Sequence, residues 1–121
     1  MKPTNLVHKT ITKTKINDYS ITRLEIDLVH INYGMASDVK YNNKQRSNYS
    51  ADDIATAFES LDGLEIEPHM DNGYEYFVYE GPFPMLDKKK LFRMVWCIES
   101  GKVTIAGIIT FFKITRIKRI L

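Results

Sequence analysis

Hydrophobic and polar residues alternate along much of the chain, and this period of two predicts a protein built mainly of β-strands. Residues 6–16 are rich in Thr, Val and Ile that alternate with Lys, which predicts an edge-prone strand. Asn17-Asp18 is a natural turn pair, and residues 20–32 then alternate Leu24, Ile26 and Leu28 with Glu, Asp and Val. We expect a second strand there, and a helix over part of residues 20–32 stays open as the alternative.

A long loop is predicted over residues 33–49, because this stretch holds few apolar residues and has no clear period. Loops of this length are uncommon inside a compact domain and often carry function.

A short helix at about residues 51–61 is the most clearly marked element. Ser50 is a suitable N-cap, and Asp53 stands three residues later, where the acid of a capping box is found. Asp62-Gly63 is suited to end the helix. Its apolar face is formed by Ile54, Phe58 and Leu61. A helix this short is not stable alone, so we expect it to pack on a sheet.

The second half of the chain predicts further strands, at residues 64–67, 74–80, 91–99 and 102–112. Residues 81–84 read as a turn, and Ser100-Gly101 predicts a tight hairpin. Residues 113–121 fit either a last strand or a short amphipathic helix. This order predicts an α+β fold, with a mostly antiparallel curved sheet and one clear short helix packed on it, in a single domain over residues 1–121.

Composition narrows the class of protein. Apolar residues make up 44% of the chain, which is enough for a core. No stretch approaches the roughly 18–20 uncharged apolar residues of a membrane helix, and the first residues lack the apolar region of a secretory signal. Cys97 is the lone cysteine and reads as a packing residue. We expect a cytoplasmic protein with no membrane partner.

Charge is unevenly distributed although the net charge is only +2. Residues 51–71 carry seven acids and no Lys or Arg, whereas residues 72–121 carry nine basic groups against four acids. This asymmetry allows a positive face for a polyanion and a negative face for another partner. The acids could equally cover the solvent side of the helix and its exit loop.

Sequence signatures of cofactor-dependent or nucleotide-binding enzymes are not found in the chain. His8, His30 and His69 are scattered, so a metal site would depend on the fold to gather them. We expect neither a metal nor a cofactor.

The most suggestive group of polar residues is His30 with Lys40, Lys44, Arg46 and Tyr49, on or just before the long loop. RNA cleavage needs a group that accepts a proton from the 2′-hydroxyl, a group that protonates the leaving oxygen, and cations at the phosphate. His suits the proton transfers, Arg suits phosphate, and Tyr can stack on a base. The alternative is a solvated loop and an ordinary strand histidine.

A second candidate RNA contact joins basic residues with an aromatic segment, as in proteins that hold single strands. The basic residues are Lys88, Lys89, Lys90 and Arg93, and the aromatic ones are Tyr74, Tyr76, Phe77 and Tyr79. The lysines could instead protect a sheet edge. A third cluster, in the tail, is formed by Lys113, Arg116, Lys118 and Arg119.

Two stretches resemble a family of small bacterial toxins. KQRSNYSADDIATAFESLDG is similar to their segment of an arginine followed by a Ser-capped helix, and KKKLFRMVWCIESGKVTIAGIITFFKI resembles their closing hairpin. The family is the RelE-like and colicin-like RNase superfamily, and the resemblance covers about residues 44–112. It implies a curved antiparallel sheet and RNA cleavage without a metal. It also implies silencing by a cognate antitoxin or immunity protein.

The resemblance implies roles for individual residues. Arg46 and Arg93 would bind phosphate, His30 would be the general acid or base, and Thr110 would hydrogen-bond the reacting phosphate. Lys40 would add a further RNA contact. The chain differs from ribosome-dependent members of the family because it has only a small excess of basic over acidic residues.

Two functions follow from the sequence. The first is a metal-independent endoribonuclease. The second is a non-enzymatic inhibitor, immunity or antitoxin-type protein that acts through the acidic residues 52–71, because such surfaces meet basic partners. The sequence indicates neither the RNA target nor the oligomeric state.

Overall fold

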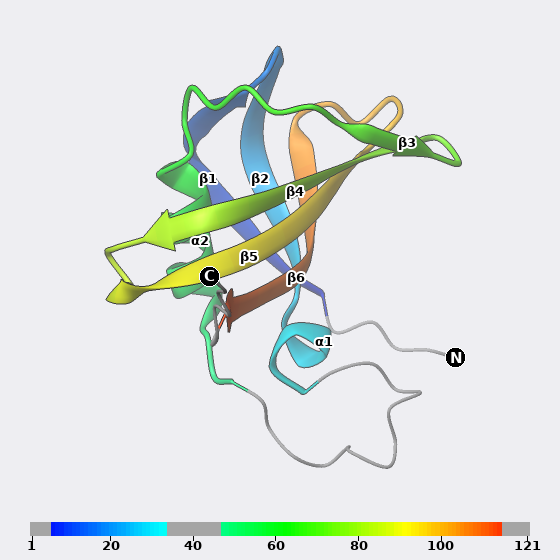
Figure 1. Cartoon of the computed structure of the whole chain (residues 1–121). Helices are drawn as coiled ribbons and strands as arrows, with labels where there is room; N and C mark the ends of the chain where they lie inside the picture. The colour runs from blue at the N-terminus through cyan, green and yellow to red at the C-terminus, as the bar shows by residue number, and fades with distance from the viewer. Residues whose placement is uncertain (1–5, 34–46, 115–121) are drawn as a thin grey trace.

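The computed structural model describes residues 6–33 and 47–114. These residues form one mixed sheet and two short helices (Figure 1). In chain order the elements are β1 (Leu6–Ile16), β2 (Tyr19–Asp27), α1 (Leu28–Tyr33), α2 (Ala51–Glu59), β3 (His69–Asp71), β4 (Tyr74–Phe83), β5 (Asp87–Glu99) and β6 (Ile105–Ile114). The predicted sheet-dominated α+β class is confirmed.

The sheet has the strand order β1-β2-β6-β5-β4-β3. Its pairings are antiparallel except that of β2 with β6, which is parallel and places Ile26 opposite Ile108. Figure 1 shows β1 and β2 running across the direction of β4 and β5, as the twist of a multi-stranded sheet requires. The parallel pairing joins the N-terminal hairpin to the C-terminal strands.

The hydrophobic core lies between α2 and one face of the sheet. Alternate residues of β5, namely Phe92, Met94 and Trp96, are fully buried on this side. Phe58 of α2 contacts Trp96 edge to face, with ring centroids 5.3 Å apart. The opposite side of the sheet, termed the open face from here on, carries the residues between them, Arg93, Val95 and Cys97.

Helix α2 begins as the sequence predicted. The Ser50 side chain accepts a hydrogen bond from the Asp53 N–H at 3.0 Å, and the Asp53 carboxylate accepts one from the Ser50 N–H at 3.1 Å. This reciprocal pair is a capping box. Beyond the helix end, Gly63 adopts a φ of +95°, in the left-handed region that favours glycine. The predicted helix is confirmed, with its regular part ending at Glu59.

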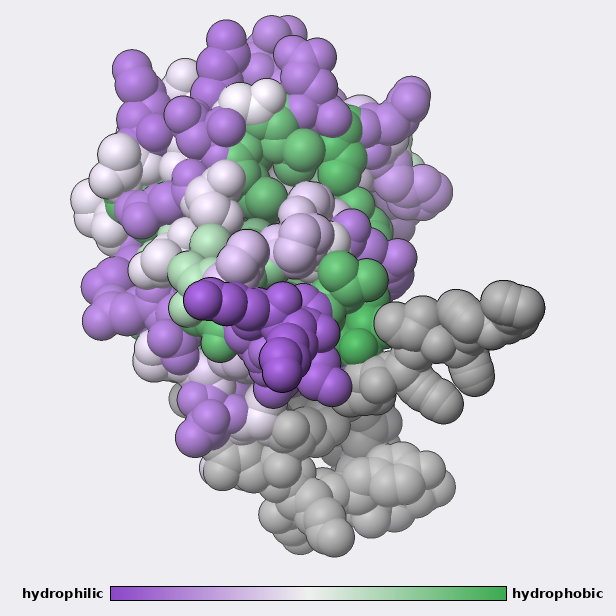
Figure 2. Space-filling model, turned by 60° about the vertical axis from the view of Figure 1, so that its left-hand side comes forward, coloured by the Kyte–Doolittle hydropathy of each residue, from purple (hydrophilic) through white to green (hydrophobic). Residues whose placement is uncertain are grey.

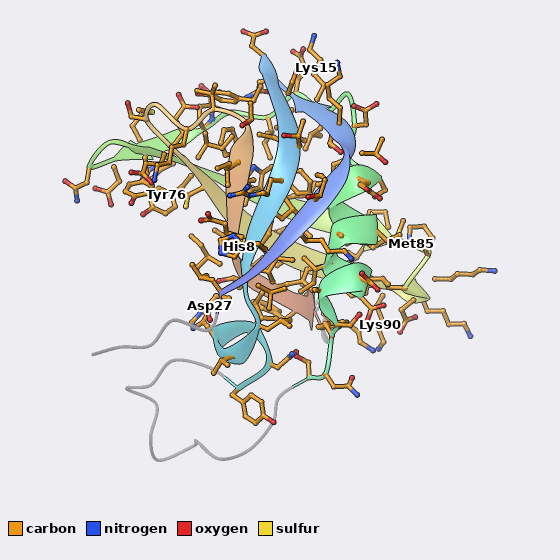
Figure 3. The ribbon with its side chains drawn as sticks, turned by 180° about the vertical axis from the view of Figure 1, so that it is seen from behind. His8, Lys15, Asp27, Tyr76, Met85 and Lys90 are labelled. Carbon is orange, nitrogen blue, oxygen red and sulfur yellow. The ribbon has the colours of Figure 1, made fainter. Side chains whose placement is uncertain are left out.

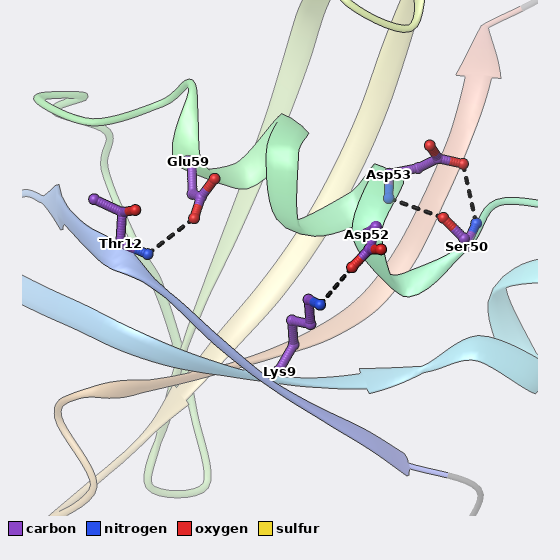
Figure 4. Close-up of polar contacts among 6 residues, drawn as sticks. All are labelled: Lys9, Thr12, Ser50, Asp52, Asp53 and Glu59. Atoms are coloured by element: carbon purple, nitrogen blue, oxygen red, sulfur yellow. Dashed lines mark hydrogen bonds and ion pairs between the residues drawn. The ribbon is translucent and has the colours of Figure 1, made fainter.

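The edge strand β1 is fastened to α2 by acidic side chains. Glu59 accepts a hydrogen bond from the Thr12 N–H at 2.9 Å, and Asp62 accepts one from the Lys15 N–H at 2.7 Å. Lys9 also forms an ion pair with Asp52 (Figure 4). The bonds to Glu59 and Asp62 satisfy backbone donors that an edge strand would otherwise leave unpaired.

Strand β2 stops earlier than a continuous strand over residues 20–32 would. The chain turns into α1 after Asp27, whose carboxylate accepts a hydrogen bond from the His30 N–H at 3.1 Å. Asp27 therefore acts as the N-cap of this short helix. The predicted strand is confirmed for residues 20–27, and the helical alternative is confirmed for residues 28–32.

Three other sequence predictions are wrong in detail. The strand expected at residues 102–112 begins only at Ile105, because residues 100–104 form a longer turn between β5 and β6 than the tight hairpin predicted at Ser100-Gly101. Residues 64–67 do not form a strand and make only a bridge from Leu64 to Ile16, because the Asn17 side chain pairs with both backbone groups of Ile66. The turn expected at residues 81–84 lies later, since β4 continues to Phe83 and β5 already begins at Asp87. Of the tail at 113–121, residues up to Ile114 belong to β6, and the remainder lies outside the described residues.

In the described part of the chain, neither helix is long and apolar enough to cross a membrane.

Candidate functional site

A β-bulge in β6 decides which side chains reach the open face. Val95 pairs with Thr110 and Trp96 pairs with Ile108, so Ile109 is the extra residue of the bulge. Without it, Thr110 would follow Ala106 and Ile108 into the core. With it, Phe111 is buried instead and Thr110 lies half-buried beside Val95 on the open face.

Arg93 and Thr110 are brought together by this arrangement. Arg93 pairs with Phe112 across the β5–β6 ladder, two residues from Thr110 on the same face. Diagonal neighbours in an antiparallel ladder lie about 7–8 Å apart, within reach of a long side chain. A phosphate placed over β5 and β6 could therefore meet both the guanidinium and the hydroxyl.

Glu80 is a third member of this group that sequence reasoning did not single out. It lies opposite Arg93 on β4, and its carboxylate accepts a hydrogen bond from the Arg93 guanidinium in an ion pair. The two side chains are 51% and 38% exposed, and exposed pairs of this kind contribute only about 0–1 kcal/mol. The pair therefore orients the guanidinium, and a phosphate can replace Glu80 as its partner. The alternation of aromatic and acidic residues over residues 74–80 was the sequence signal that could have identified Glu80.

His30 lies on α1, and α1 packs against β6, the strand that carries Thr110. The side chain is half-buried, while its backbone N–H is bonded to Asp27. Parallel pairing of β2 with β6 explains this placement, because the chain leaves β2 one residue beyond the pair Ile26–Ile108 and enters α1 beside the last part of β6. Helix α1 thus lies beside the C-terminal half of that strand.

Tyr49 has a packing role. Its ring contacts Phe111 with centroids 4.7 Å apart, and the Asn32 side chain binds both backbone groups of Tyr49 at 3.0 Å. Burial raises the pKa of the Tyr49 hydroxyl, and the carboxylates of Asp87 and Asp53 add to this effect. The ring joins the chain before α2 to the core and to α1, and the base-stacking role expected for Tyr49 stays a prediction.

Basic side chains gather where β4 turns into β5. Lys88 and Lys90 are exposed, and Lys113 of β6 forms an ion pair with Asp87 at 3.3 Å. The backbone N–H of Lys89 lowers the pKa of Asp87 most, with smaller contributions from Lys113 and Lys90. Figure 2 shows hydrophilic side chains at the front over this turn, next to apolar ones. This basic cluster, Lys88, Lys89, Lys90 and Lys113, lies on the same two strands as Arg93 and Thr110.

The aromatic segment of β4 is divided between the two faces. Phe77 is fully buried in the core, and Tyr79 packs on Phe83 with centroids 5.2 Å apart. Tyr74 and Tyr76 alternate with these residues and stay half-buried, with their rings 6.0 Å apart. Only two of the four aromatic residues therefore remain candidates for stacking on a base.

The remaining sequence-predicted residues, Lys40, Lys44 and Arg46, lie outside the described residues. Within the described ranges, no cluster of three or more His, Cys, Asp or Glu side chains could hold a metal ion.

The acidic stretch is largely used in structural contacts. Asp53 belongs to the capping box, Asp52 pairs with Lys9, and both Glu59 and Asp62 accept hydrogen bonds from β1. Four of the seven acids of residues 51–71 are thus committed within the fold. They cover the solvent side of α2 and hold the edge strand.

No family model, curated protein or solved structure matches this chain.

Proposed function

We propose that the protein is a metal-independent endoribonuclease of the small bacterial toxin type, whose site lies on the open face around Arg93 and Thr110. The observation that carries the proposal is the bulge at Ile109, which turns Thr110 to the face that presents Arg93. Bulges are frequent beside active sites because they re-aim a side chain. A guanidinium and a hydroxyl side by side on a sheet can together hydrogen-bond a phosphodiester.

The chemistry proposed is an internal transfer at phosphorus. The 2′-oxygen loses its proton to a general base and attacks the adjacent phosphorus, while the bond to the 5′-oxygen breaks and a general acid protonates that oxygen. The products are a 2′,3′-cyclic phosphate and a free 5′-hydroxyl, so atoms and charge balance without a co-reactant. Cations and hydrogen-bond donors stabilise the negative charge that builds up on the phosphoryl oxygens.

Residue roles follow from side-chain chemistry and, for Arg93 and Thr110, also from their places on the open face. Arg93 and Arg46 bind phosphate, because the guanidinium fork matches two phosphoryl oxygens. Thr110 donates a hydrogen bond to the reacting phosphate. His30 serves as general acid or base, because an imidazole can both accept and donate a proton. Further RNA contacts come from Lys88 and Lys90 of the basic cluster and from Lys40 and Lys44.

The proposal has consequences for the setting of the protein. An RNA substrate places its action in the cytoplasm, and a nuclease produced there has to be held silent by a cognate antitoxin or immunity protein. The resemblance further implies that the sheet is curved, which would give the open face a concave surface for binding RNA.

The alternative function, an inhibitor or antitoxin-type protein acting through acidic residues 52–71, has less support. Such a surface needs carboxylates that are available to a partner. Asp53, Glu59 and Asp62 are instead bonded to backbone groups of this chain, and Asp52 is paired with Lys9. The acids left for a partner, Glu65, Glu67 and Asp71, are exposed and spaced along an extended segment.

The decisive experiment is incubation of the purified chain with total RNA, with and without ribosomes, in excess chelator. We expect discrete fragments that end in a cyclic phosphate, and their loss in His30→Ala, Arg46→Ala and Arg93→Ala. His8→Ala and Arg23→Ala are matched controls, because they remove the same groups from β1 and β2. Circular dichroism and thermal unfolding verify the fold of each variant, and His30→Gln repeats the test with a smaller change in shape.

Two outcomes overturn the proposal. The first is intact RNA at high protein concentration, with ribosomes present. The second is cleavage that persists at the original rate in folded His30, Arg46 and Arg93 variants, since a contaminating nuclease would behave in that way. Slow growth of a host that expresses the chain, relieved by Arg93→Ala, would support the toxin assignment.

A further inference from the structure

A hollow of about 240 Å³ lies on the open face, further along β5 than Arg93. It is bordered by residues of β1, β2, β4, β5 and β6, so five of the six strands of the sheet contribute to it. Its apolar lining comes chiefly from Leu6, Cys97, Ile105 and Ile109, and its polar lining from Glu25, Asp27, Glu99, Lys102 and Tyr74. Figure 3 labels His8 and Asp27 on the neighbouring strands β1 and β2 at this end of the sheet.

A glycine creates the depth of the hollow. Gly107 lies in one row across the sheet, between Glu25 of β2 and Cys97 of β5. A Cβ atom at this position would meet the Cys97 Sγ at 3.5 Å, an ordinary contact distance, so a side chain would fill the space without disturbing the backbone. The φ of Gly107 is not in the left-handed region, so its conformation does not require glycine. Because Gly107 has no side chain, space is left on the open face between Glu25 and Cys97.

Carboxylates surround this floor on two sides. Glu25 and Asp27 stand on β2, and Glu99 stands on β5. Among the residues that the structure describes, Lys102 is the one cation in the lining, and it pairs with Glu99 at 3.6 Å; His8 lies 3.7 Å from Glu25. The described lining thus contains three carboxylates and one lysine. Two of these carboxylates, Glu25 and Asp27, come from β2, and Arg23 is the next residue along the same face of that strand.

We propose that this hollow binds an amphipathic cation, an alkylguanidinium or alkylammonium group with an aliphatic stem. The stem lies on Ile105, Gly107 and Ile109, and the cationic head reaches Glu25 and Asp27 on β2. Partly desolvated carboxylates attract a cation more strongly than solvated ones do. The ring of Tyr74 on the opposite wall adds a face over which a cation is favoured.

The hollow is separate from the RNA site. Its carboxylates repel phosphate, whereas Arg93 attracts it, so the open face carries negative charge at the hollow and positive charge at Arg93. The inference therefore stands independently of the ribonuclease proposal. A cation with a stem is found either in a free amine or in an arginine side chain of a partner protein, and the two sources share this chemistry.

Cys97 offers a direct readout, because its Sγ borders the floor. Burial raises the pKa of the Cys97 thiol, with smaller contributions from Glu99 and Glu25, so alkylation by iodoacetamide is slow and sensitive to occupancy. The probes are agmatine and a Gly-Arg-Gly peptide blocked at both ends. We expect millimolar agmatine or peptide to slow alkylation about threefold to tenfold, as a bound group over the thiol excludes the reagent. Stronger protection by the peptide assigns the site to a partner's arginine, and stronger protection by agmatine assigns it to a free amine.

Variants and a neutral probe make the test specific. Glu25→Gln keeps the shape and removes one charge, and Gly107→Ala fills the floor, so both should weaken protection several-fold while the melting temperature stays close to that of the native chain. Glu65→Gln, a change at an exposed acid outside the hollow, should leave protection unchanged. Equal protection by neutral N-butylurea, equal protection of the Glu25→Gln variant, or no protection by either cation overturns the proposal.

Discussion

Glu59, the last residue of α2, accepts a hydrogen bond at 2.9 Å from the backbone N–H of Thr12 in the middle of β1. Three residues further along each segment, Asp62 accepts a hydrogen bond from the Lys15 N–H. Edge strands with free donors tend to pair with other chains. The end of α2 therefore anchors β1 and also shields this edge of the sheet.

Replacing Glu59 tests this anchor. We expect Glu59→Ala to lower the free energy of unfolding by about 0.5–1.5 kcal/mol, the usual net contribution of one hydrogen bond. Glu59→Gln should cost less, because the amide oxygen can still accept the bond. Urea unfolding measures both variants, with Glu65→Ala as the control at an exposed acid. Equal stability of the Glu59→Ala and Glu65→Ala proteins would show that the contact contributes nothing.

The capping box gives a second test. Ser50→Ala removes the acceptor of the Asp53 N–H, and we expect a loss of about 0.5–2 kcal/mol, as for other N-cap substitutions. Because α2 covers the core through Phe58, the loss should appear in the global unfolding transition and not only as fraying of the helix. Ser20→Ala, at an exposed position of β2, is the matched control. A Ser50→Ala protein as stable as this control would contradict the role of the box.

Local elements were predictable from the sequence because their signals lie within a few residues. Ser50 and Asp53 mark the start of α2, and Asn17 and Gly101 mark hairpin turns, where both adopt positive φ values. The alternation in residues 91–99 likewise indicated β5. Each of these signals depends on one turn of helix or one strand, so no knowledge of distant partners was required.

Features that depend on pairing between distant segments were not predictable. The alternation in residues 105–108 gives no sign that Ile109 will be skipped, because the bulge forms only when β6 is matched to β5. The parallel contact of β2 with β6 joins residues about 80 positions apart along the chain. Arg93, Thr110 and the hollow at Gly107 depend on these pairings, so sequence alone suggested the residue types and not their arrangement. Gly107 within a strand was the one available signal of a close approach.

Asp87 predicts a dependence of stability on pH. Its pKa is lowered in the folded protein, first by the Lys89 N–H and then by Lys113. A lowered carboxyl pKa stabilises the folded state above the unfolded value of about 3.9, and this contribution is lost as the pH falls through the folded pKa. The stability difference between the native chain and Asp87→Asn should therefore be largest near neutral pH and should vanish in acid.

Urea unfolding from about pH 6 to about pH 2 measures this difference. Lys113→Ala should reduce it only in part, because the backbone N–H of Lys89 remains in place. A difference between the native chain and Asp87→Asn that is constant over this range would contradict the assignment.

The Glu80–Arg93 pair gives the sharpest test of RNA binding, since its two members have opposite effects. Arg93→Ala should weaken binding of a short single-stranded RNA and reduce the slope of log affinity against log salt by about 1, the signature of one lost phosphate contact. Glu80→Gln frees the guanidinium from its carboxylate and removes a negative charge beside the phosphate. Because the exposed pair contributes at most about 1 kcal/mol, we expect affinity to rise by up to about fivefold at low salt. Fluorescence anisotropy across a salt series measures both, with Arg23→Ala as the control. Binding that Arg93→Ala leaves unchanged, or that Glu80→Gln weakens, would mean that the guanidinium serves only to pair β4 with β5.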